Sequence, residues 1–375
     1  MKGIEEVNNL RGKRVLVRAS LNVPIEEGAV RSDFRLQKML PTLKLLSEAG
    51  AHTIIIGHVG RDKDRSLAPV HRILSTFIKA SFIEQVVGPM VIHAIENMQD
   101  GDIVMLENLR QKEGEVSNSE AFAKELASYA DIYVNDAFPV CHREHASIVG
   151  IPKLLPSYAG IQLSREVAEL SNARDPQHPS LFILGGAKFE TKKPLLRKLL
   201  DMYDGVFVGG ALANDFFKAK GYEVGNSVVS PGMFGLEDLV GNPKIMLPTD
   251  VVVERNGVVS TKLPSEVKAG ETIVDAGVET VRVLNERICS GKYILWNGPL
   301  GYYDKGYDTA TVAFAKEFAR CPAYTILGGG DTIASIANLG LEEKISFISS
   351  GGGAMLQFLL EGTLPGIEAL EESVH

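Results

Sequence analysis

Short apolar runs alternate along the chain with segments whose apolar residues recur at helical spacing. In the first half the runs read KRVLVRA (13–19), HTIIIG (52–57), DIVML (102–106) and DIYV (131–134). Nearly continuous apolar runs of this length are typical of strands that are buried on both faces of a parallel sheet. Strands that alternate with helices predict an α/β fold with parallel sheets.

Capping signals delimit two of the helices in the first half. One covers residues 34–49, with Asp33 as its predicted N-cap, and Pro41 inside it predicts a kink or a break. The other covers residues 117–130, and the Ser-x-x-Glu pattern at 117–120 predicts a capping box at its start.

The second half repeats one pattern four times: an apolar strand, a glycine turn and a helix. The copies read SLFILGGAKFETKK (180–193), GVFVGGALA (205–213), YTILGGGDTIA (324–334) and FISSGGGAM (347–355). Glycine lets a phosphate approach the backbone, and a helix N-terminus offers unpaired N–H groups and partial positive charge. One such copy is most simply a tight strand-to-helix connection, whereas four copies favour a nucleotide site.

The remaining apolar runs complete a second set of strands. Residues 244–253 predict a buried strand pair, and residues 273–277 and 293–296 predict two further strands. Between the two halves, a proline-containing stretch is followed by a helical pattern at 161–173, which we interpret as a connector between domains. A chain of 375 residues fits two domains, since domains commonly hold about 100–200 residues.

Composition excludes several classes of function. The chain is 45% hydrophobic, 23% charged and carries a net charge of −8, which argues against general nucleic-acid binding. Its apolar runs are far shorter than the roughly 20 residues of a membrane span, and its first residues lack the apolar segment of a secretion signal. Three scattered cysteines predict neither a disulfide framework nor a zinc site. We therefore expect a cytoplasmic protein that does not bind a membrane.

Basic side chains follow the predicted strands of the first half. These side chains are Arg18, His58, Arg61, Arg110, His142, Arg143 and His145, joined by Arg35 at the start of a helix and by Asn22. Because parallel strands end at one edge of a sheet, we expect the group to converge there. A single arginine of this kind is usually a solvated surface group, but the whole set predicts a pocket for a small phosphorylated anion. His142 and His145 lack a third ligand at a spacing typical of zinc sites, so we expect no metal on them.

An aspartate follows one of the triple-glycine turns. Asp331 directly after Gly328–Gly330 places a carboxylate where a phosphate is also expected. Mg²⁺ would reconcile the two anions, because it binds carboxylate and phosphate oxygens together; the simpler alternative is a helix N-cap. Neither a G-x-G-x-x-G nor a G-x-x-x-x-G-K-[ST] pattern occurs, which disfavours an NAD-dependent dehydrogenase and a P-loop enzyme.

Taken together, eight segments in the same order resemble the phosphoglycerate kinase family over nearly the whole chain. They are VLVRASLNVP (15–24), HVGR (58–61), ENLR (107–110), YVNDAF…HREHAS (133–147), LGGAKFETK (184–192), WNGPLG (296–301), GGGDT (328–332) and SGGGA (350–354). The resemblance implies two Rossmann-like three-layer domains with parallel sheets that face each other across a hinged cleft. It implies transfer of a phosphoryl group between 1,3-bisphosphoglycerate and ADP, giving 3-phosphoglycerate and ATP, in glycolysis and gluconeogenesis.

The resemblance also implies a division of the chain. Residues 1–155 would form the acid-substrate domain, with the tail 363–375 packing back on it. Residues 156–174 would form the connector helix and hinge, and residues 175–362 the nucleotide domain. The partners would be 3-phosphoglycerate or 1,3-bisphosphoglycerate and ADP or ATP, with Mg²⁺ bound alongside the nucleotide, and we expect a monomer.

Site residues follow from the matching motif positions. The acid substrate would contact Ser20, Asn22, Arg35, His58, Val59, Gly60, Arg61, Arg110, His142 and Arg143. The nucleotide would contact Gly186, Lys188, Lys192, Gly210, Asn297, Pro299, Asp304, Gly329, Gly330, Asp331 and Thr332, with Asp331 on the Mg²⁺. The catalytic set would be Arg35, Lys192, Gly329 and Gly352. An acid substrate is already ionised at neutral pH, so the reaction needs positioned charge rather than a general base.

The chain departs from the family pattern at three places. Ser20 stands where the family has an aspartate, Pro139–Cys141 replace a glycine turn, and Asp304 replaces a glutamate. Serine accepts a hydrogen bond without charge and from a shorter side chain. These departures leave two alternatives open: a degenerate paralogue that binds without turnover, and a kinase for a different carboxylic acid.

Overall fold

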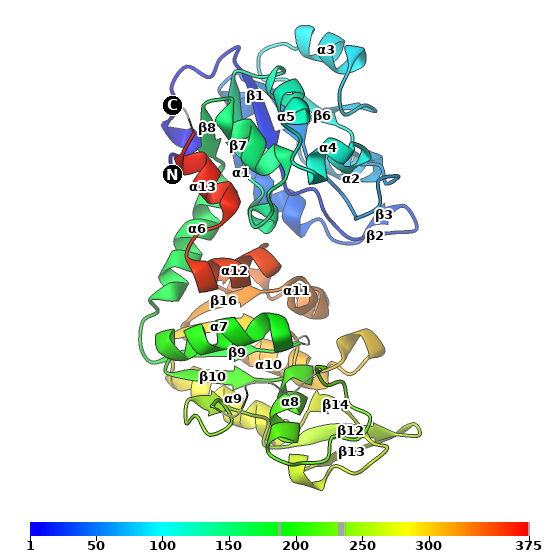
Figure 1. Ribbon diagram of the computed structural model, residues 1–375, viewed down its shortest axis with the longest axis vertical. Coiled ribbons are helices and arrows are strands. Elements are labelled where there is room, and N and C mark those ends of the chain that lie inside the picture. Colours follow the sequence, from blue (N-terminus) through cyan, green and yellow to red (C-terminus); the bar gives the residue numbers. More distant parts are fainter. Residues whose placement is uncertain (187–188, 232–235, 237, 374–375) are drawn as a thin grey trace. The chain divides into compact units, whose positions relative to one another are not determined.

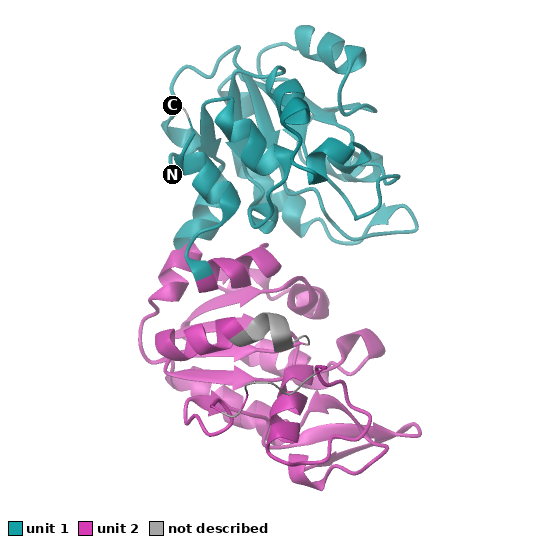
Figure 2. Ribbon diagram, viewed as in Figure 1, with its two compact units in different colours: residues 1–168, 361–375 teal, residues 169–360 magenta. Residues whose placement is uncertain are grey.

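The computed structural model divides the chain into two compact units (Figure 2). Unit 1 comprises residues 1–168 and 361–375, and unit 2 comprises residues 169–360. The structure describes the whole chain except residues 187–188, 232–235, 237 and 374–375; the side chains of residues 189–193 also lie outside the description. No helix among the described residues is both long and apolar enough to span a membrane.

Unit 1 is built on a parallel sheet of six strands in the order β5-β6-β4-β1-β7-β8 (Figure 1). The strands are β1 (Arg14–Arg18), β4 (His52–Ile56), β5 (Ser81–Ile83), β6 (Ile103–Leu106), β7 (Ile132–Asn135) and β8 (Ser157–Ala159). The helices are α1 (Phe34–Glu48), α2 (Ala68–Leu74), α3 (Pro89–Glu96), α4 (Glu113–Val116), α5 (Glu120–Ala127) and, from the end of the chain, α13 (Pro365–Glu371). A two-stranded hairpin pairs β2 (Ile25–Glu26) with β3 (Ala29–Val30).

Single turns of 3₁₀ or π helix connect these elements. In unit 1 they are η1 (Ile4–Glu6), η2 (Leu109–Gln111), η3 (Phe138–Val140), the π turn η4 (Ala146–Gly150) and η5 (Ile151–Lys153). The centre of the sheet is fully buried. Leu16 of β1 is in register with Ile54 of β4 and Tyr133 of β7, and none of the three is exposed to solvent. Burial of one apolar side chain of this size contributes about 1.5–3 kcal/mol, so the buried apolar residues of these strands hold the unit together.

The C-terminal tail belongs to unit 1. Helix α13 contacts η4 and β8, and the N–H of Gly366 donates to the carbonyl of Cys141 over 2.8 Å. A side chain at Gly366 would overlap Ile148, so the close approach of helix to turn requires glycine.

Unit 2 repeats the architecture with the order β11-β10-β9-β15-β16-β17, all neighbours parallel. These strands are β9 (Ser180–Leu184), β10 (Gly205–Val208), β11 (Ile245–Met246), β15 (Tyr293–Asn297), β16 (Tyr324–Gly328) and β17 (Phe347–Ile348). The helices are α7 (Phe189–Met202), α8 (Ala211–Ala219), α9 (Val278–Ser290), α10 (Thr309–Phe318), α11 (Gly330–Ile336) and α12 (Gly353–Glu361), with turns η6 (Pro264–Glu266), η7 (Tyr303–Lys305), η8 (Ala337–Leu339) and η9 (Glu342–Lys344). The division between the units falls inside α6 (Ile161–Arg174).

The segment 244–253 contains two strands, as predicted, but they do not pair with each other. Strand β11 joins the parallel sheet beside β10, whereas β12 (Val251–Arg255) lies in a separate antiparallel sheet between β13 (Val258–Lys262) and β14 (Thr272–Ala276). Apolar strands are buried equally well whether they pair with each other or join different sheets, so the apolar pattern alone could not distinguish the two arrangements.

One capping prediction is wrong and the other is confirmed only in part, although both helices exist. Asp33 is the N-cap residue of α1, but its side chain makes no capping hydrogen bond, and its Oδ1 accepts from Nε2 of Gln37 over 3.1 Å. Helix α5 begins at Glu120 with Ser119 as its N-cap, and Ser117 ends α4. Helix α1 runs unbroken through Pro41. The proline removes only one backbone hydrogen bond, and the packing of the buried face of the helix on the sheet outweighs that loss.

Candidate active site

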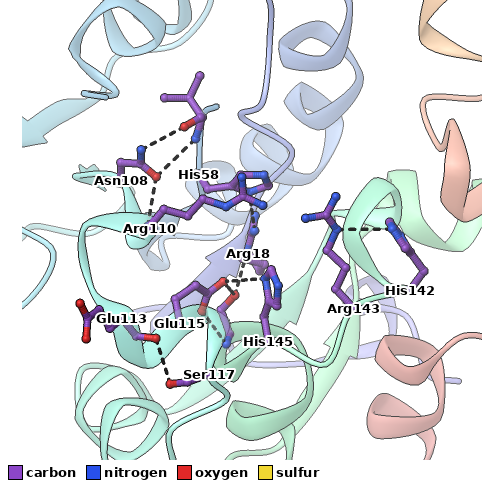
Figure 3. A network of polar contacts seen from close by, with 12 residues as sticks. Arg18, His58, Asn108, Arg110, Glu113, Glu115, Ser117, His142, Arg143 and His145 are labelled. Carbon is purple, nitrogen blue, oxygen red and sulfur yellow. Dashed lines mark hydrogen bonds and ion pairs between the residues drawn. The ribbon is translucent and has the colours of Figure 1, made fainter. Parts of the chain in front are cut away.

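The basic side chains of unit 1 converge at the carboxyl edge of its sheet, as Figure 3 shows. Arg18 ends β1, His58 follows β4, Arg110 lies in η2 after β6, and Arg143 follows β7. Parallel strands necessarily end at one edge, so segments far apart in the chain deliver their side chains to the same place.

Arg18 forms the buried base of this cluster. Its Nε donates to Oγ of Ser147 over 2.9 Å, and its two terminal nitrogens contact the carbonyl of Ala19 (2.6 Å) and Nδ1 of His58 (2.9 Å). Burial lowers the pKa of Arg18, while the negative charge of Glu115 opposes that effect. The guanidinium is thus held by hydrogen-bond partners on three segments.

His58 is kept neutral by its surroundings. Burial lowers its pKa far below the ordinary value, and the positive charges of Arg18, Arg110 and Arg143 lower it further. A protonated imidazole would add a charge to an already positive cluster. His58 therefore takes part as a hydrogen-bonding group rather than as a cation.

A second set of contacts links the loops on the same edge. The N–H of Gly60 donates to Oδ1 of Asn22 over 2.9 Å, and a terminal nitrogen of Arg35 donates to the carbonyl of Asn22 over 2.6 Å. Arg110 donates to the carbonyl of Gly60. Burial lowers the pKa of both arginines, and the charge of Arg143 lowers that of Arg110 further. The structure therefore brings Asn22, Arg35, Gly60 and Arg110 into one connected group.

The other predicted residues of unit 1 lie around that group. Val59 is buried and its backbone binds Asn108, while Arg61 is exposed and Ser20 is partly exposed. Nε of Arg143 lies 3.4 Å from Nε2 of His142. Burial and Arg143 lower the pKa of His142, so this imidazole also favours the neutral form.

The sequence did not single out the polar residues that hold these loops. The amide of Asn108 donates to the carbonyls of Val59 (3.1 Å) and Arg65 (2.8 Å), which braces the loop that follows β4. Glu107 accepts from the N–H of Leu67 over 2.6 Å and so anchors the start of α2. Both lie in the ENLR segment, but nothing in their spacing indicated a bracing role.

Unit 2 contains a cavity of about 250 Å³ beside its glycine turns. Five of the predicted nucleotide residues line it: Gly186, Gly210, Pro299, Asp304 and Asp331. Apolar residues that were not predicted form much of the remaining wall, among them Phe217, Val228, Pro248, Ile273 and Leu300. A mostly apolar cavity with a few polar groups is typical of a site for a flat organic ring.

Two glycines allow the turns of this cavity to touch. Gly298 has φ +101°, and any side chain there would overlap the backbone of Gly185; a side chain at Gly185 would overlap Gly298 and Pro299 in turn. The N–H of Gly185 donates to the carbonyl of Asn297 over 2.8 Å. The contact between the turn after β9 and the turn after β15 is therefore made by backbone alone.

Replacing Gly298 by alanine is expected to lower the free energy of unfolding by about 2 kcal/mol, because the side chain is strained at positive φ and overlaps backbone that cannot rotate away. Urea unfolding followed by circular dichroism measures the change. Gly241→Ala is the matched control, since a side chain there meets nothing within 4 Å. Equal unfolding midpoints for the two variants would contradict this reading of the turn.

The other predicted residues of unit 2 whose side chains the structure describes lie at the same strand ends and are not among the residues that line the cavity. Asn297 ends β15 and is buried beside Gly329, and Oγ1 of Thr332 accepts from the N–H of Gly298 over 2.7 Å. Gly330 begins α11, and Gly352, with φ +53°, precedes α12. Lys188 lies outside the described residues, and Lys192 lies in α7 with its side chain outside the description.

The carboxylate of Asp331 is exposed at the start of α11. The hydroxyl of Tyr303 donates to its Oδ1 over 3.4 Å, and burial together with Asp331 and Asp304 raises the pKa of that tyrosine. Among the described residues no group of three or more histidines, cysteines or carboxylates could hold a metal ion alone. One exposed carboxylate beside a cavity fits Mg²⁺, which commonly takes one or two protein carboxylates and completes its shell with phosphate oxygens and water.

Two parallel-sheet units, one with a basic edge and one with glycine turns beside an apolar cavity, define the class: an α/β enzyme of phosphoryl transfer. A family model described as phosphoglycerate kinase matches residues 4–363. The chain belongs to the phosphoglycerate kinase family, and its activity is that of a kinase that transfers phosphate to a carboxyl group.

Individual phosphoglycerate kinases are similar to this chain over nearly their full length. A phosphoglycerate kinase of Roseiflexus sp. (strain RS-1) is 38% identical, covering 96% of this chain and 97% of that protein, and one of Clostridium beijerinckii is 39% identical, covering 99% of each. The solved phosphoglycerate kinase of Coxiella burnetii matches with a TM-score of 0.83 and 34% identity, and that of Pyrococcus horikoshii OT3 with 0.89 and 32%; each match covers 99% of this chain and 98% of the other. No finding supports a degenerate paralogue or a different acid.

Proposed function

We propose that unit 1 binds 3-phosphoglycerate or 1,3-bisphosphoglycerate and that unit 2 binds ADP or ATP with Mg²⁺. The observation that carries this assignment is the basic edge of unit 1, where three guanidiniums and a neutral imidazole lie at the ends of four neighbouring strands. Bidentate guanidiniums suit the phosphate and carboxylate groups of such a substrate. The apolar cavity of unit 2 suits a nucleobase, with the glycine turns and Asp331 on the phosphate side.

The described side chains of unit 1 perform positioning and charge neutralisation. An acid substrate presents an ionised carboxylate, so none of the histidines has to remove a proton. Arg110 and Arg143 offset the charge of the substrate phosphate, while Asn22 and Gly60 hold the loops that present them. Ser20 would accept a hydrogen bond from a substrate hydroxyl, in place of a carboxylate.

Arg35 and Lys192 are proposed to neutralise the phosphoryl oxygens during transfer. Backbone N–H groups at Gly329 and Gly352 would add donors to the same oxygens, since charge that develops in the transition state is best met by preorganised donors. Asp331 would hold Mg²⁺, which screens the phosphate charges of the nucleotide. We further propose that the chain acts as a cytoplasmic monomer.

A coupled assay tests the proposal on the whole chain. With 3-phosphoglycerate and MgATP the enzyme should turn over, EDTA should abolish the rate, and added Mg²⁺ should restore it. Absence of turnover at saturating concentrations of both substrates would contradict the proposed substrates. Full activity in EDTA would contradict the Mg²⁺ assignment alone.

A further inference from the structure

A chain of four buried polar groups runs behind the basic edge of unit 1. It consists of Glu115 in α4, Ser147 in η4, Arg18 at the end of β1 and His58 after β4, with exposed fractions of 1%, 0%, 0% and 3%. Groups so deeply buried cannot exchange partners with water, so the hydrogen bonds between them determine their orientation. Neither Glu115 nor Ser147 has a role in the site described so far.

The direction of the first hydrogen bonds follows from the carboxylate. Glu115 accepts from both the N–H (3.0 Å) and the hydroxyl (2.7 Å) of Ser147. A serine hydroxyl has one hydrogen, and here it points to Glu115. The oxygen of Ser147 therefore offers only its lone pairs to its other partner, Nε of Arg18, at 2.9 Å.

The direction of the last hydrogen bond follows from the guanidinium. Arg18 has donors only, so the contact of 2.9 Å between its terminal nitrogen and Nδ1 of His58 requires an unprotonated Nδ1. A neutral imidazole carries one proton, and that proton must then reside on Nε2. The neighbouring positive charges and burial keep the ring neutral by lowering its pKa.

The other ring nitrogen is available to a ligand. Within the part of the chain that the structure describes, no group hydrogen-bonds to Nε2 of His58, and this atom is not among the fully buried polar atoms that lack a partner. It lies in the cluster that includes Arg110 and Arg143, as Figure 3 shows. An N–H at this place is a donor toward an anion, whereas the opposite tautomer would present a lone pair to it.

Glu115 supplies the negative charge that balances the buried guanidinium of Arg18. Burial by itself raises its pKa, but the imidazole of His145 at 3.7 Å, the charge of Arg18 and two hydrogen bonds from Ser147 outweigh that effect and lower it, so the carboxylate stays ionised. An ionised carboxylate is needed here, because a buried guanidinium without a counter-charge is strongly unfavourable.

We propose that Glu115 and Ser147 are positioning residues that act through Arg18 to hold His58 as the Nε2–H tautomer, so that it donates a hydrogen bond to an anionic oxygen of the acid substrate. This inference rests on the proposed function, in which His58 contacts that substrate. The three hydrogen bonds join different elements. In the first, a carboxylate can only accept, and in the last, a guanidinium can only donate, so the donor and the acceptor are fixed in both.

The tautomer is directly observable by ¹⁵N NMR of the full-length enzyme labelled at histidine. The wild type should show His58 with the proton on Nε2 and no titration from about pH 5.5 to 8. Ser147→Ala removes the acceptor of Arg18 Nε, so His58 should show mixed tautomers or become protonated. The KM for 3-phosphoglycerate should rise about tenfold, while kcat and the KM for MgATP change by less than about twofold.

Matched controls separate this role from a general effect on folding. Ser117→Ala makes the same chemical change at an exposed serine that ends α4, where the hydroxyl contacts only a backbone carbonyl. Glu115→Gln is a second variant that turns one acceptor into a donor, and Glu113→Gln is its exposed counterpart on the same helix. The two control variants should keep the wild-type tautomer and KM, and thermal unfolding identifies variants that are folded.

The outcomes distinguish this inference from the proposed function. If folded Ser147→Ala and Glu115→Gln both keep a pure Nε2–H tautomer and an unchanged KM while His58→Ala raises the KM, the positioning role is overturned and the acid site stands. If His58→Ala leaves the KM for 3-phosphoglycerate unchanged, the assignment of the acid site itself fails.

Discussion

Replacing Arg35 by alanine is expected to lower kcat by about 10²–10³-fold while leaving the Kd for ADP unchanged. Arg35 is partly buried and its terminal nitrogen donates to the carbonyl of Asn22, so its position is fixed before substrate binds. A preorganised cation contributes more to a transition state than a mobile one, because no reorganisation is needed when charge develops. ADP binding should be unaffected, since the described residues that line the cavity proposed for the nucleotide all belong to unit 2.

Steady-state kinetics and isothermal titration with ADP measure the two quantities. Arg31→Ala is the matched control, because Arg31 is an exposed guanidinium that pairs with Glu26 over 2.9 Å just before the same helix. Arg35→Lys should recover only part of the rate, since a lysine keeps the charge but loses the planar fork. An Arg35→Ala variant with a near-normal kcat would refute the proposed role.

Replacing Lys192 by alanine is expected to reduce kcat by a similar factor, about 10²–10³-fold. The position lies in α7, in the segment that begins at the glycine turn after β9. A lysine in this role offsets charge on the phosphoryl oxygens mainly during transfer, so kcat and kcat/KM should fall together. The proposed role places Lys192 at the transferring phosphoryl group and not at the base, so the Kd for ADP should change little.

Lys198→Ala serves as the control for this variant, because it removes the same charge from the same helix six positions later. Single-turnover measurements with MgATP and 3-phosphoglycerate separate the chemical step from product release. Loss of ADP affinity with a normal single-turnover rate would assign Lys192 to nucleotide binding instead of transfer.

Most of the strands in the two parallel sheets, and several helices, were predictable from the order of apolar residues, whereas the edge strands β5 and β8 of unit 1 were not predicted. The four runs of the first half became β1, β4, β6 and β7, with ends within about one residue of the predicted ones. Apolar runs of four to seven residues have few other stable arrangements in a protein that alternates them with helices. The resemblance to the phosphoglycerate kinase family was confirmed by the family model and by relatives of full length.

Pairing and capping were less predictable, because they depend on contacts distant in sequence. Ser119 rather than Ser117 caps α5, and β12 joins an antiparallel sheet that the apolar pattern did not indicate. The wall of the cavity in unit 2 combines residues from α8, β14 and the turn after β15, such as Phe217, Ile273 and Leu300. Each of these is an ordinary apolar residue until the fold places it beside the others.

By itself, the sequence determined the fold class, the repeated glycine turns and the set of basic residues at the strand ends. It could do so because these depend on local periodicity, on backbone conformation and on the rule that parallel strands end at one edge. Only the tertiary structure revealed that Glu115 and Ser147 stand behind Arg18 and orient His58. Hydrogen-bond direction inside a core depends on which donors and acceptors are left facing one another after packing, and no spacing along the chain encodes that.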